Sequence, residues 1–377
     1  MPVFNEIHVP NEIFTKILMK LDGRSLHTAR QVSKEWNSVI KEQIMGTAEG
    51  RREMERTLQH QWRELTPARL EFTIEKALNR RFPTISDPFA VICSKNSSSD
   101  MTKVRVVNIR EGVEVMEVSC PKDSLVYDAR LFKDVLVVAG GTDVLAWNIH
   151  TRKKIFEKKF SAPRIVSDHQ NLQVMLGRSL RLEISGSTVI ETIQSPLPGP
   201  LESFSHPYYL TWGSGGDSHT LWKVDGNIRE EIGVVGVGMG FVFCPAREIL
   251  VTLSVSVHSL SRIKLRVYSC LTGQLIKDRD VTAPTASYHF QNLQVNDNQL
   301  VVGCMNVMLV YQLESLLSQS ADQDISPRML EIGQPGFFVC GELDMSKTSV
   351  SAVLERIDEE KTIKFILILF DFWNCQD

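Results

Sequence analysis

The sequence predicts a small helical segment followed by a larger all-β domain made of repeated units. Apolar residues recur with the period of a helix from Pro10 to about Arg81, and beyond Pro88 the pattern becomes that of strands. Within the strand-like part, an apolar strand followed by a strand that carries Trp or Tyr recurs about every 30 to 55 residues. These observations favour the α plus all-β class, with the helices at the N-terminus.

The helical segment contains two apolar stripes separated by a turn. Pro10 and Asn11 are typical of a helix start, and Asp22-Gly23 is a turn signal that ends the first stripe. The first stripe consists of Ile13, Phe14, Ile17, Leu18 and Leu21, and the second of Leu26, Ala29, Val32, Trp36, Val39, Ile40 and Ile44. Because about 40 helical residues bury too little surface to be stable alone, either a partner or the downstream domain must cover these stripes.

The order of residues from 9 to 37 carries a specific motif. Its members are Val9, Pro10, Glu12, Ile13, Lys16, Ile17, Leu18, Leu21, Asp22, Leu26, Ala29, Arg30, Gln31, Val32, Ser33, Trp36 and Asn37. This order resembles the F-box, above all in a Pro-x-Glu-Ile start at the right distance from Val-Ser-x-x-Trp. Val9 stands where leucine is usual and Gly23 where proline is usual, and neither change removes an apolar contact residue.

The resemblance implies a partner. F-box segments bind a Skp-type adaptor, which links them to the cullin and RING subunits of a ubiquitin ligase. The residues that would bind the adaptor are Pro10, Ile13, Ile17, Leu18, Leu21, Leu26, Val32 and Trp36. Some of these eight must instead hold the helices together. We expect an F-box over residues 1–46, a helical linker over 47–87 and the β domain over 88–377.

Seven copies of the repeated unit fit into the β domain. Clear copies lie at residues 135–149, 208–226, 249–269 and 300–313, and weaker ones at 90–109, 172–184 and 350–373. Repeats near 40 residues, each of four short strands, are typical of a β-propeller, because a single four-stranded blade cannot bury both of its faces. We therefore predict a seven-bladed propeller, with a β-sandwich as the alternative.

The repeats resemble degenerate WD repeats. The aromatic residues expected on the third strand of a blade are Trp147, Trp222, Tyr268 and Tyr311. No Gly-His pair precedes the blades and no clear Trp-Asp closes them, so the usual Asp–His hydrogen-bond network is not expected. The last strand, residues 364–373, has the character of an inner strand. The outer strand of the last blade must then come from elsewhere, and residues 70–77 are the candidate.

The sequence contains no pattern typical of catalysis or metal binding. His-Glu-x-x-His and Gly-x-Ser-x-Gly are absent, and the seven cysteines occur singly, never as Cys-x-x-Cys. The cysteines therefore fit reduced, buried thiols. The glycines from Gly233 to Gly240 lack the lysine and following helix of a phosphate loop and are expected to connect two blades. We predict no catalytic residue, no metal and no cofactor.

Composition and charge argue against some classes of partner. The 377 residues are 43% hydrophobic and carry a net charge of -3, which favours neither nucleic acid nor an anionic membrane. The N-terminus lacks the features of a secretory signal, and the longest apolar run, residues 365–370, is far shorter than the roughly 20 residues of a membrane helix. We expect a cytoplasmic or nuclear protein.

Loops on one rim of a propeller usually contact its protein partner. If the strands are assigned correctly, the turns between second and third strands and the links between blades gather on this rim. The candidate substrate-binding residues there are Arg164, Arg178, Trp212, His219 and Arg262. Together with the F-box, they predict the substrate receptor of a Skp–cullin–F-box ligase with an unknown protein substrate. The alternative is a non-ligase F-box scaffold that binds the adaptor alone, or a propeller that serves protein interactions.

Overall fold

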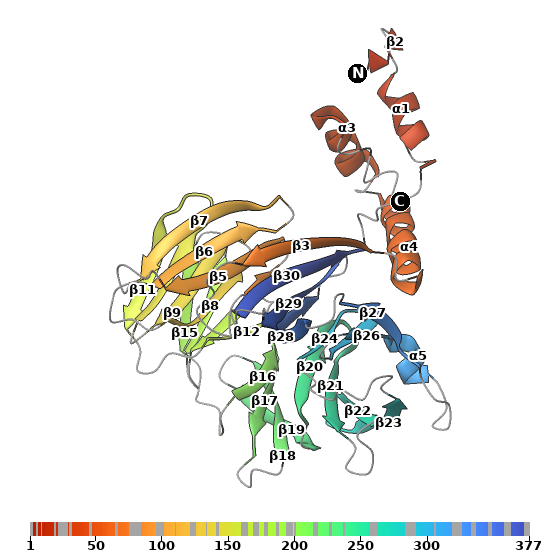
Figure 1. Cartoon of the computed structure of the whole chain (residues 1–377). Coiled ribbons are helices and arrows are strands. Elements are labelled where there is room, and N and C mark those ends of the chain that lie inside the picture. Colours follow the sequence, from red (N-terminus) through yellow and green to blue (C-terminus); the bar gives the residue numbers. More distant parts are fainter. Residues whose placement is uncertain are drawn as a thin grey trace. The chain divides into compact units, whose positions relative to one another are not determined.

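Helices occupy the N-terminal part of the chain and strands the rest, as the change of period predicts. The computed structural model (Figure 1) forms two compact units, one of residues 1–70, 348–350 and 369–377, the other of residues 71–347 and 351–368. The structure describes the chain apart from residues 1–2, 5–6, 9, 19, 22–28, 30–31, 45–46, 65–66, 75–83, 87, 96–101, 110, 121–125, 133, 141–142, 160–164, 169–172, 177–179, 186–187, 194–198, 200, 214–217, 226–227, 237, 256–261, 283–291, 305–306, 319–325, 333–336, 346–348, 358–362 and 373–377.

The first unit holds the N-terminal helices. Its elements are the paired strands β1 (Val3–Phe4) and β2 (Ile7–His8), the helices α1 (Asn11–Leu18), α3 (Lys34–Val39) and α4 (Ala48–Glu64), and the π-helical turn η1 (Ile40–Ile44). The carbonyl of Pro10 accepts the amide hydrogens of Ile13 and Phe14, both at 3.0 Å, so α1 begins directly after the proline. This agrees with the predicted helix start.

One small apolar core holds these helices together. It consists of Phe14, Leu18, Ala29, Val39, Ile40 and Ile44, with Leu21 and Trp36 packed against it. The rings of Phe14 and Trp36 meet edge to face, with their centroids 4.8 Å apart. Both predicted stripes therefore contribute to a single core. This core has few residues, as expected for a segment that is small for a domain.

Helix α4 is fixed by an aromatic contact within the same unit. Trp62 is buried, and its ring stacks on that of Phe372 with the centroids 3.7 Å apart. Phe372 follows directly after strand β30 (Ile363–Asp371), near the end of the chain. A stacked pair of large buried rings is worth about 1 kcal/mol beyond its burial. The two ends of the sequence thus meet in one structural unit.

Seven four-stranded antiparallel sheets make up the rest of the described chain (Figure 1). The first three are β4 (Thr84–Ser86), β5 (Phe89–Lys95), β6 (Thr102–Asn108) and β7 (Val113–Cys120); β8 (Val126–Phe132), β9 (Val135–Gly140), β10 (Asp143–Asn148) and β11 (Lys154–Lys159); and β12 (Ile165–Asp168), β13 (Gln173–Leu176), β14 (Leu180–Ser185) and β15 (Thr188–Ile193). The next three are β16 (Leu201–Ser205), β17 (Tyr208–Trp212), β18 (Ser218–Asp225) and β19 (Ile228–Gly236); β20 (Gly240–Cys244), β21 (Ile249–Val255), β22 (Arg262–Ser269) and β23 (Leu275–Thr282); and β24 (Asn292–Val295), β25 (Gln299–Gly303), β26 (Val307–Gln312) and β27 (Arg328–Glu331). The last is β28 (Phe337–Met345), β29 (Ser349–Ile357), β30 and β3 (Ala68–Ile74). Two short helices, η2 (Pro245–Arg247) and α5 (Leu313–Ser318), lie between strands.

The sheets are the blades of a β-propeller. The first strand of each sheet contacts the first strand of the next, in the order β4, β8, β12, β16, β20, β24 and β28, and β28 contacts β4. Six of the seven sheets consist of four strands that are consecutive in the sequence. Consecutive strands alone therefore complete six blades, whereas seven blades were predicted. The remaining sheet is composite, because its outer strand β3 comes from the N-terminal side of the chain. This ring of separate sheets excludes the β-sandwich alternative.

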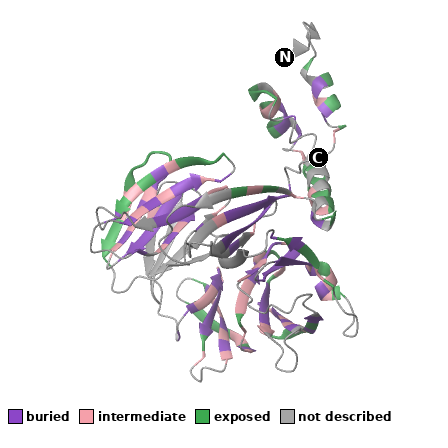
Figure 2. Cartoon of the chain, in the orientation of Figure 1, coloured by how far each residue is buried: buried purple, intermediate pink, exposed green. Residues whose placement is uncertain are grey.

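The repeats visible in the sequence are the second and third strands of the blades. All seven predicted copies fall on such a pair, and the four predicted aromatic residues lie on the third strands β10, β18, β22 and β26. These middle strands are flanked on both sides by others, so they carry the most apolar residues. β9 and β25 are buried along their whole length, whereas the outer strand β11 is mostly exposed (Figure 2). Apolar layers then form between neighbouring blades, as between β17 and β20.

Three blades share one turn between their third and fourth strands. The third strand ends in a polar residue whose side chain accepts the amide hydrogens of residues two or three positions on; these residues are Asn108, Asn148 and Ser269. Four positions later, the backbone is left-handed, at Gly112 (φ 67°), Arg152 (φ 56°) and Gly273 (φ 69°). This recurring turn was not predicted from the sequence.

One prediction about the chain between the helices and the blades was wrong. The linker expected to be helical over residues 47–87 is helical only in α4, because residues 68–74 form β3 and residues 84–86 form β4, before the predicted start of the β domain at 88. The last strand, β30, lies between β29 and β3, so it is not the outer strand of its blade, as predicted. The expectation that the region around residues 70–77 supplies the outer strand of that blade is confirmed by β3.

We expect the two left-handed glycines to differ in their tolerance of a side chain. A Cβ at Gly112 meets nothing within 4 Å, so Gly112→Ala should lower the free energy of unfolding by about 1 kcal/mol, the cost of a left-handed alanine. A Cβ at Gly273 lies 2.6 Å from the Ile232 carbonyl of the neighbouring blade. Gly273→Ala should therefore cost at least about 2 kcal/mol. Urea unfolding of both variants checks this, and equal losses would contradict it.

The composite blade predicts a sharp boundary for N-terminal truncation. A chain that begins at residue 67 keeps β3, whereas one that begins at residue 75 leaves β30 without its outer partner. We expect the shorter chain to melt lower by about 5 °C or more, since the exposed edge loses its hydrogen bonds and its packing. Differential scanning calorimetry of the two chains checks this. Identical melting temperatures would show that β3 does not complete the blade.

Candidate functional site

Helix α1 presents an apolar surface to solvent. Ile13 and Ile17, one helical turn apart, are 53% and 54% exposed, while Phe14 and Leu18 on the opposite side lie in the core. Val32, which precedes α3, is 62% exposed. Large aliphatic side chains exposed to this extent on a short helix are available to a partner. We refer to Ile13, Ile17 and Val32 as the apolar face of the helical unit.

The structure divides the eight predicted adaptor-binding residues into two groups. Pro10, Ile13, Ile17 and Val32 are exposed, whereas Leu18, Leu21 and Trp36 contribute to the core. Leu26 lies outside the described residues. Only the exposed group can contact a partner without rearrangement of the helices, so the motif combines exposed residues with residues that hold the helices together.

The Val-Ser-x-x-Trp part of the motif has a direct structural explanation. Ser33 is the N-cap of α3, with extended backbone, and its Oγ accepts the amide hydrogen of Trp36 at 3.1 Å. The cap fixes where the helix begins. It thereby directs Trp36 onto Phe14 in the core and leaves Val32 outside, next to the first turn. The spacing of three between Ser33 and Trp36 is thus the spacing of a capped helix.

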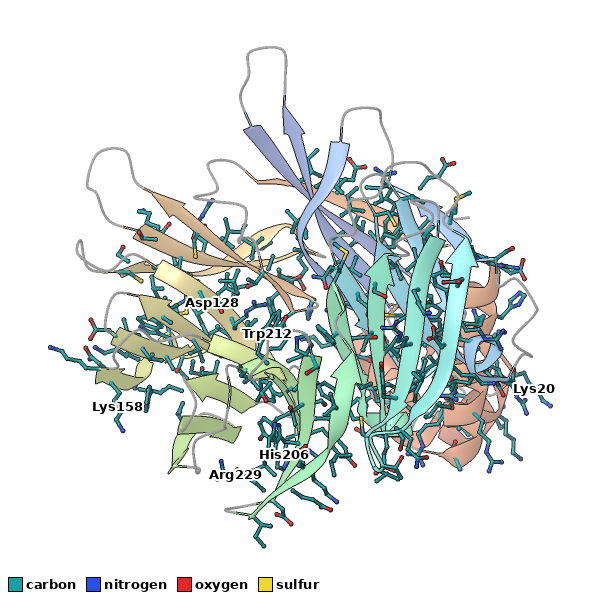
Figure 3. All side chains as sticks on the ribbon, turned by 90° about the horizontal axis from the view of Figure 1, so that it is seen from below. Lys20, Asp128, Lys158, His206, Trp212 and Arg229 are labelled. Carbon is teal, nitrogen blue, oxygen red and sulfur yellow. The ribbon has the colours of Figure 1, made fainter. Side chains whose placement is uncertain are left out.

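The propeller rim contains the second predicted surface. Of the five candidates there, Arg164 and Arg178 lie outside the described residues, and of Arg262 the structure describes only the backbone, at the start of β22. Trp212 at the end of β17 and His219 near the start of β18 are brought together. They are cross-strand partners, and their ring centroids lie 4.5 Å apart. In Figure 3, Trp212 lies toward the middle of the propeller, whereas Lys158 and Arg229 lie at its edge.

Two residues that were not among the predicted rim residues complete this cluster. The indole N–H of Trp212 donates to Glu202 Oε2 at 2.6 Å, from the inner strand β16. On the other side, the Phe241 ring of β20, in the next blade, lies 4.4 Å from His219. Neither contact was predicted: Glu202 comes from the first strand of the same blade, and Phe241 from the first strand of the next blade. We call Glu202, Trp212, His219 and Phe241 the rim cluster.

His219 is an unusual member of this cluster. Its side chain is fully buried, and neither ring nitrogen has a hydrogen-bond partner in the part of the chain that the structure describes. Burial lowers the pKa of this histidine below its usual 6.5, with Glu202 acting weakly in the opposite direction. Since a charged imidazole without a partner would be costly here, the neutral form is held between Trp212 and Phe241 as an aromatic spacer.

Other candidate groups have structural roles. The five described cysteines, Cys93, Cys120, Cys244, Cys270 and Cys304, are buried and unbridged, and burial raises the pKa of Cys120 to about 11 and that of Cys270 and Cys304 to about 12. They are therefore inert thiols rather than nucleophiles. Of the glycines between 233 and 240, the first two lie in the outer strand β19, and the link to β20 follows.

Two searches of the described residues were negative. They contain no group of three or more His, Cys, Asp or Glu placed to hold a metal ion. No helix among them has the length and apolar character needed to cross a membrane.

Comparisons with known proteins bear on each part of the chain. Residues 7–46 match the F-box domain family. A search of curated proteins found no significant match. Similar solved structures include BamB from Moraxella catarrhalis (12% identity, TM-score 0.44, 76% of this chain and 84% of that one), Hsv2p from Kluyveromyces lactis (9%, 0.48, 78% and 97%) and the WD40 domain of SCAP from fission yeast (11%, 0.46, 82% and 88%). The propeller architecture itself rests on the strand pairing of this chain.

The buried histidine predicts a dependence of stability on pH. Because the pKa of His219 is lower in the folded than in the unfolded chain, the unfolded chain takes up a proton first as the pH falls, and stability is lost below about pH 6.5. His219→Phe keeps the aromatic spacer and removes this titration. We expect the melting temperature of the variant to rise relative to that of the wild type between pH 7.5 and 5.5, measured by scanning fluorimetry. A constant difference between them would contradict the prediction.

Proposed function

We propose that this F-box protein, with its C-terminal β-propeller, is the substrate receptor of a Skp–cullin–F-box ubiquitin ligase. The observation that carries the proposal is the F-box match over residues 7–46, together with Ile13 and Ile17 exposed on α1. F-box domains bind Skp-type adaptors. The apolar face would dock on such an adaptor, while Phe14 and Leu18 keep the helices folded.

Docking on the adaptor would bury the apolar face. Ile13, Ile17 and Val32 are each more than half exposed, and full burial of such a side chain contributes about 1.5 to 3 kcal/mol. Three of them at the centre of an interface are enough to dominate its affinity. The adaptor would then connect the chain to the cullin and RING subunits.

The propeller would capture the protein to be ubiquitylated. Catalysis requires no residue of this chain, because a receptor that holds a target lysine near the conjugating enzyme raises its effective concentration. The rim cluster, with one exposed aromatic ring fixed by its neighbours, has the character of a binding surface. Such a receptor would act in the cytoplasm or the nucleus, without a cofactor.

We expect the adaptor to depend on the exposed isoleucines of α1. Ile13→Asp combined with Ile17→Asp places charge on the apolar face without entering the core, so the full chain should stay folded but recover at least about tenfold less purified Skp-type adaptor in a pull-down. The matched control is Ile228→Asp on the outer strand β19, an isoleucine that is 74% exposed.

The same pull-down separates the alternatives. Equal recovery of adaptor by the wild type and the double variant contradicts the docking surface. When cullin and RING subunits are supplied together with the adaptor, recovery of the adaptor but not of the cullin by the wild type selects the scaffold that binds the adaptor alone. Circular dichroism confirms that each variant is folded before its recovery is compared.

A further inference from the structure

The Trp212 ring is held in place before any partner arrives. Its indole N–H is bonded to Glu202, and one side of the ring lies against His219, which is itself backed by Phe241. Trp212 nevertheless remains 38% exposed. A ring fixed on its buried side and open on the other loses little side-chain entropy when it binds, which is the usual condition for an aromatic anchor.

The charge around this ring is negative. The face of an indole attracts cations, and the Glu202 carboxylate lies beside it at hydrogen-bond distance. Within the residues that the structure describes, Glu202 makes no other hydrogen bond or ion pair, so Oε1 can accept a bond from a ligand. The guanidinium of Arg266 approaches this region near Gly236, but its Nε lies 3.5 Å from Asp278 Oδ2, an oxygen that Lys264 Nζ also contacts at 3.2 Å.

The histidine beneath the ring does not offset this charge. Because burial lowers the pKa of His219, its imidazole is neutral at physiological pH. An anionic ligand would therefore meet a π face and a carboxylate, both of which repel negative charge. A cationic ligand would gain from both groups at once.

We infer that Trp212 and Glu202 form a subsite for the lysine or arginine side chain of a protein captured on the propeller rim. The cationic head would lie over the exposed face of Trp212 and bond to Oε1 of Glu202. This inference rests on the proposed function, and it gives the captured protein a chemical feature: a basic residue at the point of contact.

An apolar neighbour of the subsite fits a peptide rather than a free cation. Gly238 packs on the Phe241 ring, where an added Cβ would lie 3.2 Å from Cζ, and the next residue, Met239, is 66% exposed. An exposed methionine adapts to many apolar shapes. The aliphatic stem of a lysine or arginine, or an apolar residue beside it, would pack there.

The test observes Trp212 directly. The full chain has six tryptophans, so labelling with 5-fluorotryptophan gives six fluorine resonances, and Trp212→Phe identifies the one of interest. The probes are the peptides acetyl-Gly-Arg-Gly-amide and acetyl-Gly-Lys-Gly-amide. Their controls are the same peptide with citrulline, the neutral isostere of arginine, and with phosphoserine. We expect the Trp212 resonance to shift with the two cationic peptides only.

A charge-removing variant shows whether the carboxylate matters. Glu202→Gln keeps an oxygen that can accept the indole N–H but removes the charge, and should weaken binding of the arginine peptide by about fivefold or more. Glu230→Gln, an exposed carboxylate on β19 of the same blade, is the matched control and should leave binding unchanged.

Three outcomes would overturn the inference: no shift with either cationic peptide, an equal shift with citrulline, or a shift with phosphoserine instead. The adaptor pull-down distinguishes this failure from failure of the proposed function. A chain that still recovers the adaptor but fails these titrations is an F-box receptor that selects its target by another chemistry.

Discussion

The pairing of β3 with β30 is the constraint on which the rest of the structure depends. A blade buries its faces only against its neighbours, so each apolar layer between blades requires the ring to be complete. Six blades are complete from consecutive strands, but the last has only three strands until β3 joins it. Because β3 directly follows the helical unit along the chain, the segment that would bind the adaptor and the strand that completes the propeller are neighbours in sequence. Within the first unit, Trp62 of α4 stacks on Phe372, the residue that follows β30.

The division between exposed and buried residues explains how a short helix can both belong to a core and present an apolar surface. Ile13 and Ile17 share one side of α1, and Phe14 and Leu18 share the other, so eight residues both fold and present a surface. Ser33 sets the start of α3 and thereby separates the exposed Val32 from the half-buried Trp36. A motif that appears to be one list of contact residues is therefore two interleaved sets.

Much of the fold could be predicted from the sequence because the middle strands of each blade are the most apolar. All seven predicted repeats, and the aromatic positions of the third strands, lie in these middle strands. The outer strands could not be found in this way, since strands such as β11 face solvent and carry no continuous apolar run. β3 lies in the segment predicted to be a helical linker, because its neighbour α4 has a strong helical pattern. Residues 70–77 could be proposed as its position only because the last blade lacked an outer strand. On the rim, Trp212 and His219 could be predicted because they flank a turn between the second and third strands of one blade. Glu202 and Phe241 come from the first strands β16 and β20, where no rim residue was predicted.

The origin of β3 also has a consequence for the order in which the protein can be made. On the ribosome, β3 is synthesised near the beginning, whereas β28, β29 and β30 are synthesised last. Domains generally fold as their residues emerge, and contacts between distant residues form slowly. The helical unit can thus be translated long before the ring closes. An incomplete chain would carry the F-box on an open propeller with an unpaired edge, a species recognisable to chaperones. The ring therefore closes only when β28, β29 and β30 have joined β3.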